Sequence, residues 1–138
     1  ACNIFSEVKS NNFLLYVMGA IYARQNGLGD CLILNQYGRI ADATIANVFW
    51  IKNGVIHTPP IEEGCVAGVT RRFLLQQLPA AGYTINEQPL TPDDLLSADE
   101  VFLTNAVRGI RAVGKCRNRS YSSSLTKEIH GLLMDKWK

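Results

Sequence analysis

Apolar residues recur along this chain at spacings that alternate between those of helices and those of strands. In the segment 12–25 they follow a helical period and predict one amphipathic helix, with a stripe formed by Phe13, Leu14, Val17, Met18, Ile21 and Tyr22. Asn26 and Gly27 can end this helix, because both residues tolerate the left-handed conformation that often follows a last helical turn.

Three further helices are predicted downstream. One begins at Gly68 and runs to about Ala81, with Pro79 disturbing its last turn. Its apolar face consists of Phe73, Leu74, Leu75 and Leu78. A short helix begins at Thr91, where a Thr cap is followed by Pro and two acidic residues. A closing helix spans about 123–137, with an inner side of Leu125, Ile129, Leu132, Leu133 and Trp137.

Short apolar runs predict the strands. The run from Cys31 to Leu34 is typical of a strand that is buried on both faces, and 101–103 is a second such run. The segments 48–51 and 55–58 predict a hairpin, because Asn53-Gly54 supplies the two positive φ angles of a type I′ turn. Extended chain is also expected at 39–43, 83–87 and 108–113.

Composition indicates one globular domain. The chain has 138 residues, of which 47% are hydrophobic and 19% charged, and its net charge is only +2. Basic residues are scattered apart from the cluster 115–119, which argues against a nucleic-acid partner. The four cysteines are widely spaced, without a paired motif, so no metal site is expected. With no membrane-length apolar run and no signal-peptide pattern, a cytoplasmic protein is predicted.

Three places could carry chemistry. Between Gly64 and Thr70 a glycine-containing loop leads into a helix, whose first amides would favour an anion such as phosphate, although a plain helix start has the same pattern. The run 104–106 follows a buried strand, and its Thr-Asn pair is typical of an ordinary turn. Asp42 lies among small and apolar residues, so its carboxylate is either on a surface loop or buried with a specific partner.

These segments also carry a family resemblance. The motifs DATIANVF (42–49), KNGVIHTPP (52–60), GVTR (68–71) and DEVFLTNAVRGIR (99–111) resemble the signature of the fold-type IV enzymes that use pyridoxal phosphate, which include class IV aminotransferases and aminodeoxychorismate lyase. The resemblance implies an α+β fold, the larger C-terminal domain of the D-amino-acid aminotransferase-like fold, with a barrel-like mixed sheet and outer helices. In that domain assignment residues 1–138 are a single cofactor-binding domain, and the family's smaller N-terminal domain is absent from this chain.

The resemblance assigns roles to individual residues. Lys9 matches the lysine that carries the cofactor as a Schiff base and then moves the substrate's proton. Asp42 takes the position of a glutamate that, in the family, pairs with the protonated pyridine nitrogen of the cofactor. The side chain of glutamate is one methylene longer than that of Asp42. The remaining implied cofactor-binding residues, those at the phosphate included, are Asn47, Val69, Thr70, Asn105 and Ala106.

Within the family, the segment 104–111 is more similar to the lyases than to the aminotransferases. The expected reaction is therefore conversion of 4-amino-4-deoxychorismate to 4-aminobenzoate and pyruvate, a step of the folate pathway. Arg108 or Arg111 could bind a substrate carboxylate, and either could equally be a structural ion-pair residue. Two alternatives remain: an aminotransferase acting on branched-chain or D-amino acids, and an inactive fragment or remnant of such an enzyme. The family resemblance also implies a homodimer with a small-molecule amino substrate.

Overall fold

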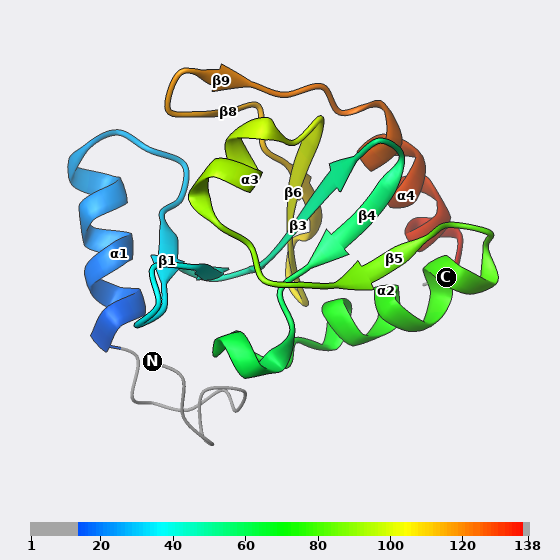
Figure 1. The fold of residues 1–138 in the computed structure, drawn as a ribbon, viewed down its shortest axis with the longest axis horizontal. Coiled ribbons are helices and arrows are strands. Elements are labelled where there is room, and N and C mark those ends of the chain that lie inside the picture. The colour runs from blue at the N-terminus through cyan, green and yellow to red at the C-terminus, as the bar shows by residue number, and fades with distance from the viewer. Residues whose placement is uncertain (1–13, 137–138) are drawn as a thin grey trace.

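The computed structural model describes residues 14–136 (Figure 1). Lys9, Phe13 and Trp137, which carry sequence-based expectations, lie outside the described residues. Within them the helices are α1 (Leu14–Gln25), η1 (Ile61–Glu63, a 3-10 turn), α2 (Val69–Ala80), α3 (Pro92–Ser97) and α4 (Ser124–Lys136). The strands are β1 (Leu32–Leu34), β2 (Ile40–Ala43), β3 (Asn47–Lys52), β4 (Val55–Thr58), β5 (Ile85–Glu87), β6 (Glu100–Asn105), β7 (Gly109–Ala112), β8 (Lys115–Cys116) and β9 (Arg119–Ser120).

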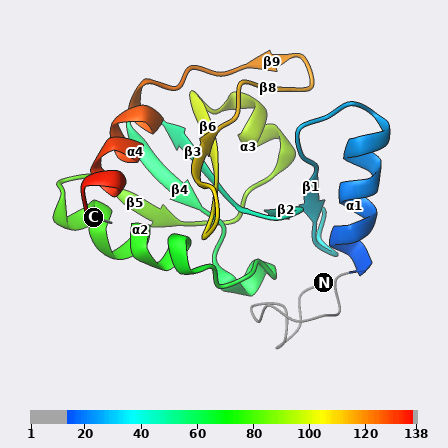
Figure 2. The same cartoon turned by 180° about the vertical axis from the view of Figure 1, so that it is seen from behind.

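The centre of the fold is a mixed five-stranded sheet with the strand order β5-β4-β3-β6-β7. Strands β4 and β5 pair in parallel, and the other neighbours pair antiparallel. Helix α3 covers one face of this sheet, whereas α2 and α4 cover the other, as the two opposite views show (Figures 1 and 2). The α+β class, with a mixed sheet and outer helices, is therefore confirmed.

The central strand β3 divides the core into two layers. Val48 and Trp50 belong to a cluster that includes Leu95 of α3. Phe49 and Ile51 belong to a second cluster, which includes Leu74 and Leu78 of α2 and Ile129 and Leu133 of α4. Because successive side chains of a strand point to opposite faces, one apolar run fills both layers.

Local sequence signals explain the turns and helix starts. Asn53 and Gly54 have φ angles of 50° and 77° and join β3 to β4, so the predicted type I′ hairpin is confirmed. The predicted cap of α3 is confirmed as a capping box, in which Thr91 and Asp94 bond each other's backbone amides. Helix α2 continues through Pro79 to Ala80, since the proline lies in the last turn, where one lost hydrogen bond is tolerable.

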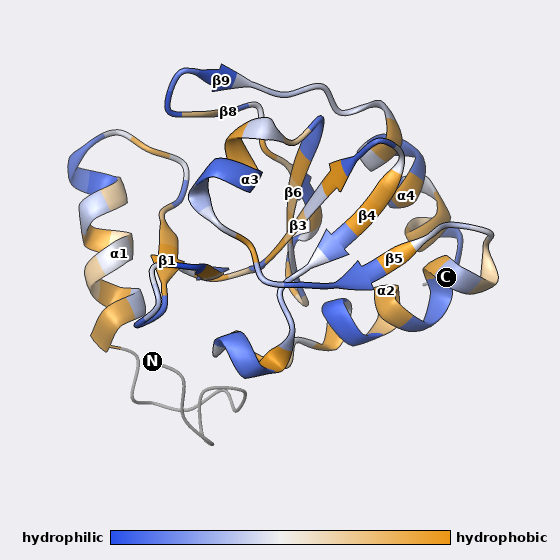
Figure 3. Cartoon of the chain, in the orientation of Figure 1, coloured by the Kyte–Doolittle hydropathy of each residue, from blue (hydrophilic) through white to orange (hydrophobic). Residues whose placement is uncertain are grey.

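Two expectations about burial are corrected. The strand predicted from the run 31–34 exists, but its burial on both faces is wrong: Ile33 is buried, whereas Leu34 is 48% exposed. Strand β1 pairs only with β2, in a separate two-stranded sheet. Its second face is covered at Leu32, which packs against the core cluster that includes Leu95, but not at Leu34. Helix α1, much of which is apolar in Figure 3, is confirmed over the described part of its predicted range, but its apolar stripe is exposed. The exposed side chains of the stripe are Leu14, Val17, Met18, Ile21 and Tyr22.

Candidate functional site

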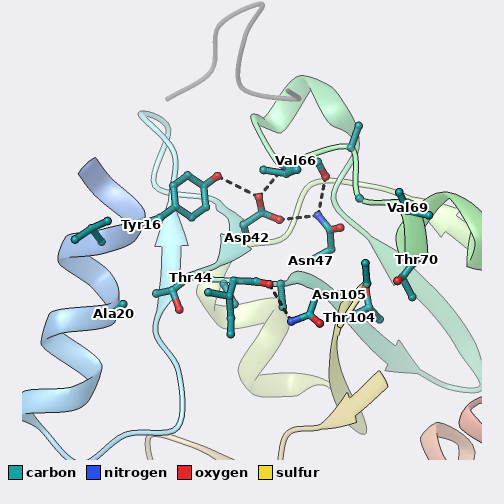
Figure 4. A pocket seen from close by; sticks show the side chains of 17 residues that line it. Tyr16, Ala20, Asp42, Thr44, Asn47, Val66, Val69, Thr70, Thr104 and Asn105 are labelled. Carbon is teal, nitrogen blue, oxygen red and sulfur yellow. Dashed lines mark hydrogen bonds between the residues drawn. The ribbon is translucent and has the colours of Figure 1, made fainter. Parts of the chain in front are cut away.

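A cavity of about 520 Å³ lies between α1 and the end of the central sheet. Its walls come from α1, the end of β2 and the turn that follows it, the loop before α2 with the first turn of that helix, and the end of β6 (Figure 4). The volume is within the range of small-molecule sites. Six residues assigned to the cofactor by resemblance line this cavity together: Asp42, Asn47, Val69, Thr70, Asn105 and Ala106.

Asp42, on β2, is a buried residue held by specific hydrogen-bond donors. Its side chain is almost fully enclosed, and its residue exposure is 2%. Oδ1 accepts from Asn47 Nδ2 at 2.8 Å. Oδ2 accepts from the Val66 amide at 2.8 Å and from the Tyr16 hydroxyl at 3.1 Å. Of the two environments that the sequence left open for this carboxylate, the structure has the buried one.

Burial dominates the electrostatics of Asp42. It raises the pKa of the carboxyl to about 7, because the charged form is poorly solvated. The three hydrogen bonds and the positive charge of Arg71 lower the pKa but do not offset the burial. Among residues 14–136 no Lys, Arg or His forms a salt bridge with Asp42. A cationic group of a ligand that reached this carboxylate would therefore draw it into the ionised form.

Asn47 connects Asp42 to the loop before α2. It is the first residue of β3, is 5% exposed, and its amide nitrogen donates both to Asp42 and to the Val66 carbonyl, each at 2.8 Å. Gly68 packs directly against it, since a Cβ at Gly68 would lie 2.1 Å from Asn47 Oδ1. The structure thus gives Asn47 a bridging position within the cavity wall.

The first turn of α2 offers hydrogen-bond donors without acceptors. The N-cap residue of α2 is Gly68, which makes no side-chain hydrogen bond to the first turn, and that turn contains no acidic residue. The amides of Val69 and Thr70 have no partner within the helix, as at any helix start. Two hydroxyls in the same cavity, Thr70 Oγ1 and Thr104 Oγ1, are buried and have no hydrogen-bond partner, and each residue is 1% exposed. Buried polar groups are normally satisfied, so this end of the cavity suits an anion with several acceptor oxygens.

Asn105 organises the turn beyond β6. Its side-chain oxygen accepts from the amides of Val107 and Arg108, at 3.0 and 2.6 Å, and its nitrogen donates to the Ile45 carbonyl at 3.1 Å. Asn105 thereby ties the turn 105–108 to the turn that follows β2, while still lining the cavity. Ala106 also lines the cavity and supplies no side-chain donor.

The two arginines expected at the substrate lie outside the cavity lining. Arg111 donates to Asp30 at 3.1 Å, and Asp30 in turn accepts from the amide and hydroxyl of Thr44. Arg111 thus has the structural ion-pair position that the sequence allowed as an alternative. Arg108 is exposed, and a substrate role for either arginine stays a prediction.

Comparisons with known proteins show the family of the chain. A model of the family described as Amino-transferase class IV matches residues 2–116, which is most of the chain. The chain belongs to the class IV aminotransferase family. Relatives of two kinds match it. A putative branched-chain-amino-acid aminotransferase of Methanocaldococcus jannaschii is 34% identical over 95% of this chain and 46% of the relative. The aminodeoxychorismate lyase of Vibrio harveyi is 34% identical over 76% of this chain and 39% of the relative.

A solved structure extends the likeness to three dimensions. The branched-chain aminotransferase of Thermoproteus uzoniensis, crystallised with norvaline, matches with a TM-score of 0.91 at 26% identity, over 95% of this chain and 45% of that one. The chain therefore spans less than half the length of each of these class IV proteins.

Sequence reasoning missed Tyr16 as a site residue, and it assigned no cofactor-binding role to Thr104, although the run 104–106 was one of the places that could carry chemistry. Tyr16 shares one face of α1 with the small residues Gly19 and Ala23, at spacings of three and seven, opposite the apolar stripe. A tyrosine on a helix face made of small residues was the sequence signal that could have identified Tyr16. Thr104 pairs with Asn47 across β3 and β6, a neighbour relation that only the strand register supplies.

Two negative findings apply to the described part of this class IV chain. None of its helices between residues 14 and 136 combines the length and apolar character that a bilayer span requires. Within the same residues, no group of three or more His, Cys, Asp or Glu side chains is placed to hold a metal ion.

The contact between Gly68 and Asn47 makes a prediction about stability. We expect Gly68→Ala to destabilise the protein by about 1–3 kcal/mol, because the added methyl displaces Asn47 from Asp42. The matched control is Gly131→Ala in α4, where a Cβ meets nothing within 4 Å. That exchange should stabilise by about 0.5–1 kcal/mol, as glycine is unfavourable inside a helix. Urea unfolding of both variants measures the difference, and equal effects would contradict the prediction.

Proposed function

We propose that this chain binds pyridoxal phosphate in the cavity beside Asp42. The observation that carries the proposal is the pair of buried, partnerless hydroxyls of Thr70 and Thr104 beside the open amides of α2. In Figure 4 these hydroxyls and Asp42 lie on different sides of Asn47, so one cavity presents donors at one place and a carboxylate at another. A ligand with a phosphate and a protonated ring nitrogen would satisfy both, and a solved aminotransferase of similar fold, that of Brucella abortus, contains this cofactor.

Different residues of the chain would hold different parts of the cofactor. The first turn of α2 and the two hydroxyls would hold the phosphate, because backbone amides and hydroxyls donate to anionic oxygens. Asp42 would pair with the ring nitrogen, and Asn47 would keep Asp42 in place. When bound, the cofactor supplies an electron sink for reactions at the carbon that carries the substrate amino group. Lys9, outside the described residues, stays the predicted residue that holds the cofactor covalently and moves the proton.

Isosteric variants test the phosphate site. Thr70→Val and Thr104→Val should each weaken binding of pyridoxine 5′-phosphate about tenfold, since a hydrogen bond to a charged group contributes about 1.5–3 kcal/mol. Neither should lower stability, because each change removes a buried hydroxyl that has no partner in the structure. Thr84→Val, at an exposed position outside the cavity, is the control. Titration calorimetry gives the affinities, and unchanged affinity in both variants would contradict the assignment.

The reaction we propose is the lyase reaction, conversion of 4-amino-4-deoxychorismate to 4-aminobenzoate and pyruvate. It is supported by the similarity of segment 104–111 to the lyases and by the lyase relative that matches 76% of the chain. An aminotransferase acting on branched-chain or D-amino acids is the second candidate, supported by the Methanocaldococcus relative that matches 95% of the chain. The third is an inactive fragment or remnant of such an enzyme, which the sequence left open.

Product analysis separates these candidates. We expect the protein, supplied with pyridoxal phosphate and 4-amino-4-deoxychorismate, to release 4-aminobenzoate, and Lys9→Ala to abolish both this activity and the visible absorbance band of the bound cofactor. Turnover of amino acids with 2-oxoglutarate, without any 4-aminobenzoate, would select the aminotransferase. A protein that develops no absorbance band with the cofactor would select the remnant.

The assembly we propose is a homodimer, and its support is the outward face of α1. Met18 and Ile21 are 58% and 51% exposed on a helix whose opposite side packs against β1, and a helix that is apolar on several sides is normally buried. A second copy of the chain would cover this face.

The cytoplasmic location, the small-molecule amino substrate and the single-domain assignment of residues 1–138 stay predictions.

Sedimentation of charged variants checks the dimer. We expect the chain to sediment as a dimer and Met18→Glu to weaken association at least tenfold, because it places a charge in the apolar contact. Met134→Glu is the matched control, because Met134 is 51% exposed on α4, at a distance in sequence and fold from α1 (Figure 1). A chain that stays monomeric at high concentration would contradict the proposal, as would equal dissociation of both variants.

A further inference from the structure

Helix α1 approaches the sheet closely enough to place a side chain at Asp42. A Cβ at Gly19 would lie 2.9 Å from Ile33 and 3.0 Å from Thr44, so the absence of a side chain lets the helix pack against β1 and the turn after β2. Tyr16 projects from the same face, one turn earlier. Its hydroxyl reaches Asp42 Oδ2 across the wall of the cavity (Figure 4).

The hydrogen bonds at Asp42 are divided unevenly between its two oxygens. Oδ2 accepts both from Tyr16 and from the Val66 amide, whereas Oδ1 accepts from Asn47. A carboxylate oxygen offers two acceptor positions. Oδ2 is therefore filled, and Oδ1 keeps one acceptor position on a residue that lines the cavity.

We propose that Tyr16 is a positioning residue, which fixes the Asp42 carboxylate and favours its ionised form so that Oδ1 can accept the ring N–H of the cofactor. This inference rests on the function proposed above. Tyr16 itself need not touch the reacting atoms; it acts through Asp42. No residue of α1 other than Tyr16 is recorded as a hydrogen-bond donor to Asp42 in the described chain.

The groups around Asp42 indicate in which direction its pKa should change when the Tyr16 hydroxyl is removed. Burial, followed by the charge and hydrogen bond of Asp42, raises the pKa of Tyr16, so its hydroxyl stays a proton donor at neutral pH. Burial raises the pKa of Cys65, in the loop before α2, to about 12, so this thiol stays neutral. Arg71, on α2, lowers the pKa of Asp42 through its charge. Removing the Tyr16 hydroxyl leaves burial opposed by fewer interactions, and the pKa of Asp42 should rise above about 7.

The first measurement needs no cofactor. Carbon-13 NMR of the Asp42 carboxyl, recorded over a pH range on the full chain, should show a midpoint about one pH unit higher in Tyr16→Phe than in the unmodified protein. Tyr22→Phe is the matched control, since Tyr22 lies on the same helix but is 55% exposed on the outward side. An unchanged Asp42 midpoint in folded Tyr16→Phe would overturn the inference.

The second measurement adds pyridoxine 5′-phosphate, which has the ring and phosphate but cannot form a Schiff base with a lysine. Tyr16→Phe should weaken its binding about fivefold at pH 7, because a rise of one unit in the pKa of Asp42 from about 7 lowers the ionised fraction of this carboxyl by about that factor. This difference in affinity from the unmodified protein should narrow towards pH 9, where Asp42 is ionised in both. In an Asp42→Asn background, Tyr16→Phe should have no pH-dependent effect. An equal loss of affinity at every pH would indicate a merely structural tyrosine and overturn the inference.

The two measurements also separate this inference from the proposed function. A chain that shows the shifted Asp42 midpoint but binds no pyridoxine 5′-phosphate would overturn the proposed cofactor, and the cofactor part of this inference with it. A chain that binds pyridoxine 5′-phosphate with an unshifted Asp42 midpoint would leave the proposed function standing and overturn the role of Tyr16 alone.

Discussion

The burial of one carboxylate constrains the architecture of the site. A charge that leaves water is costly unless hydrogen bonds replace its hydration, so Asp42 requires several donors at fixed positions. Those donors come from three separate segments: α1 supplies Tyr16, β3 supplies Asn47, and the loop before α2 supplies the Val66 amide. Each segment is thereby held at the same point, and the cavity forms where they meet. The pKa of about 7 indicates that this compensation is incomplete.

The incomplete compensation at Asp42 has a counterpart at the first turn of α2. There the hydroxyls of Thr70 and Thr104 are buried without acceptors, and the helix lacks both a capping side chain and an acidic residue. An unsatisfied buried donor costs free energy in the unliganded protein, and this cost is returned when a ligand supplies the acceptor. The cavity therefore contains an acceptor that favours a cation and donors that favour an anion. Both are satisfied by one ligand of mixed charge, which gives physical support to the family's cofactor.

The elements that could be predicted from sequence are those whose signals are local. Asn53-Gly54 determined a hairpin turn, and Thr91 with Asp94 determined a helix cap, because in each case the interacting residues are neighbours. The contacts that define the site are not local: Tyr16 and Asp42 are 26 residues apart, and Arg111 and Asp30 are 81 apart. The family resemblance brought Asp42, Val69 and Thr70 to one site, because it carries three-dimensional information that composition and periodicity lack. It assigned no role to Tyr16 or Thr104, since the positions of their hydroxyls depend on helix packing and strand register.

Helix α1 connects the site to the surface of the molecule. Its inner face carries Tyr16, which bonds Asp42, and its outer face exposes Met18 and Ile21. Gly19 and Ala23, which are buried at the inner face, contribute little apolar area, so the helix gains less from burial than a typical core helix. Covering the outer face would add the missing apolar contact and favour the position in which Tyr16 reaches Asp42. Because one helix carries both faces, a partner that bound only the position of α1 in which Tyr16 reaches Asp42 would also favour the ionised form of Asp42, and a ligand that bound ionised Asp42 would favour that partner to the same degree.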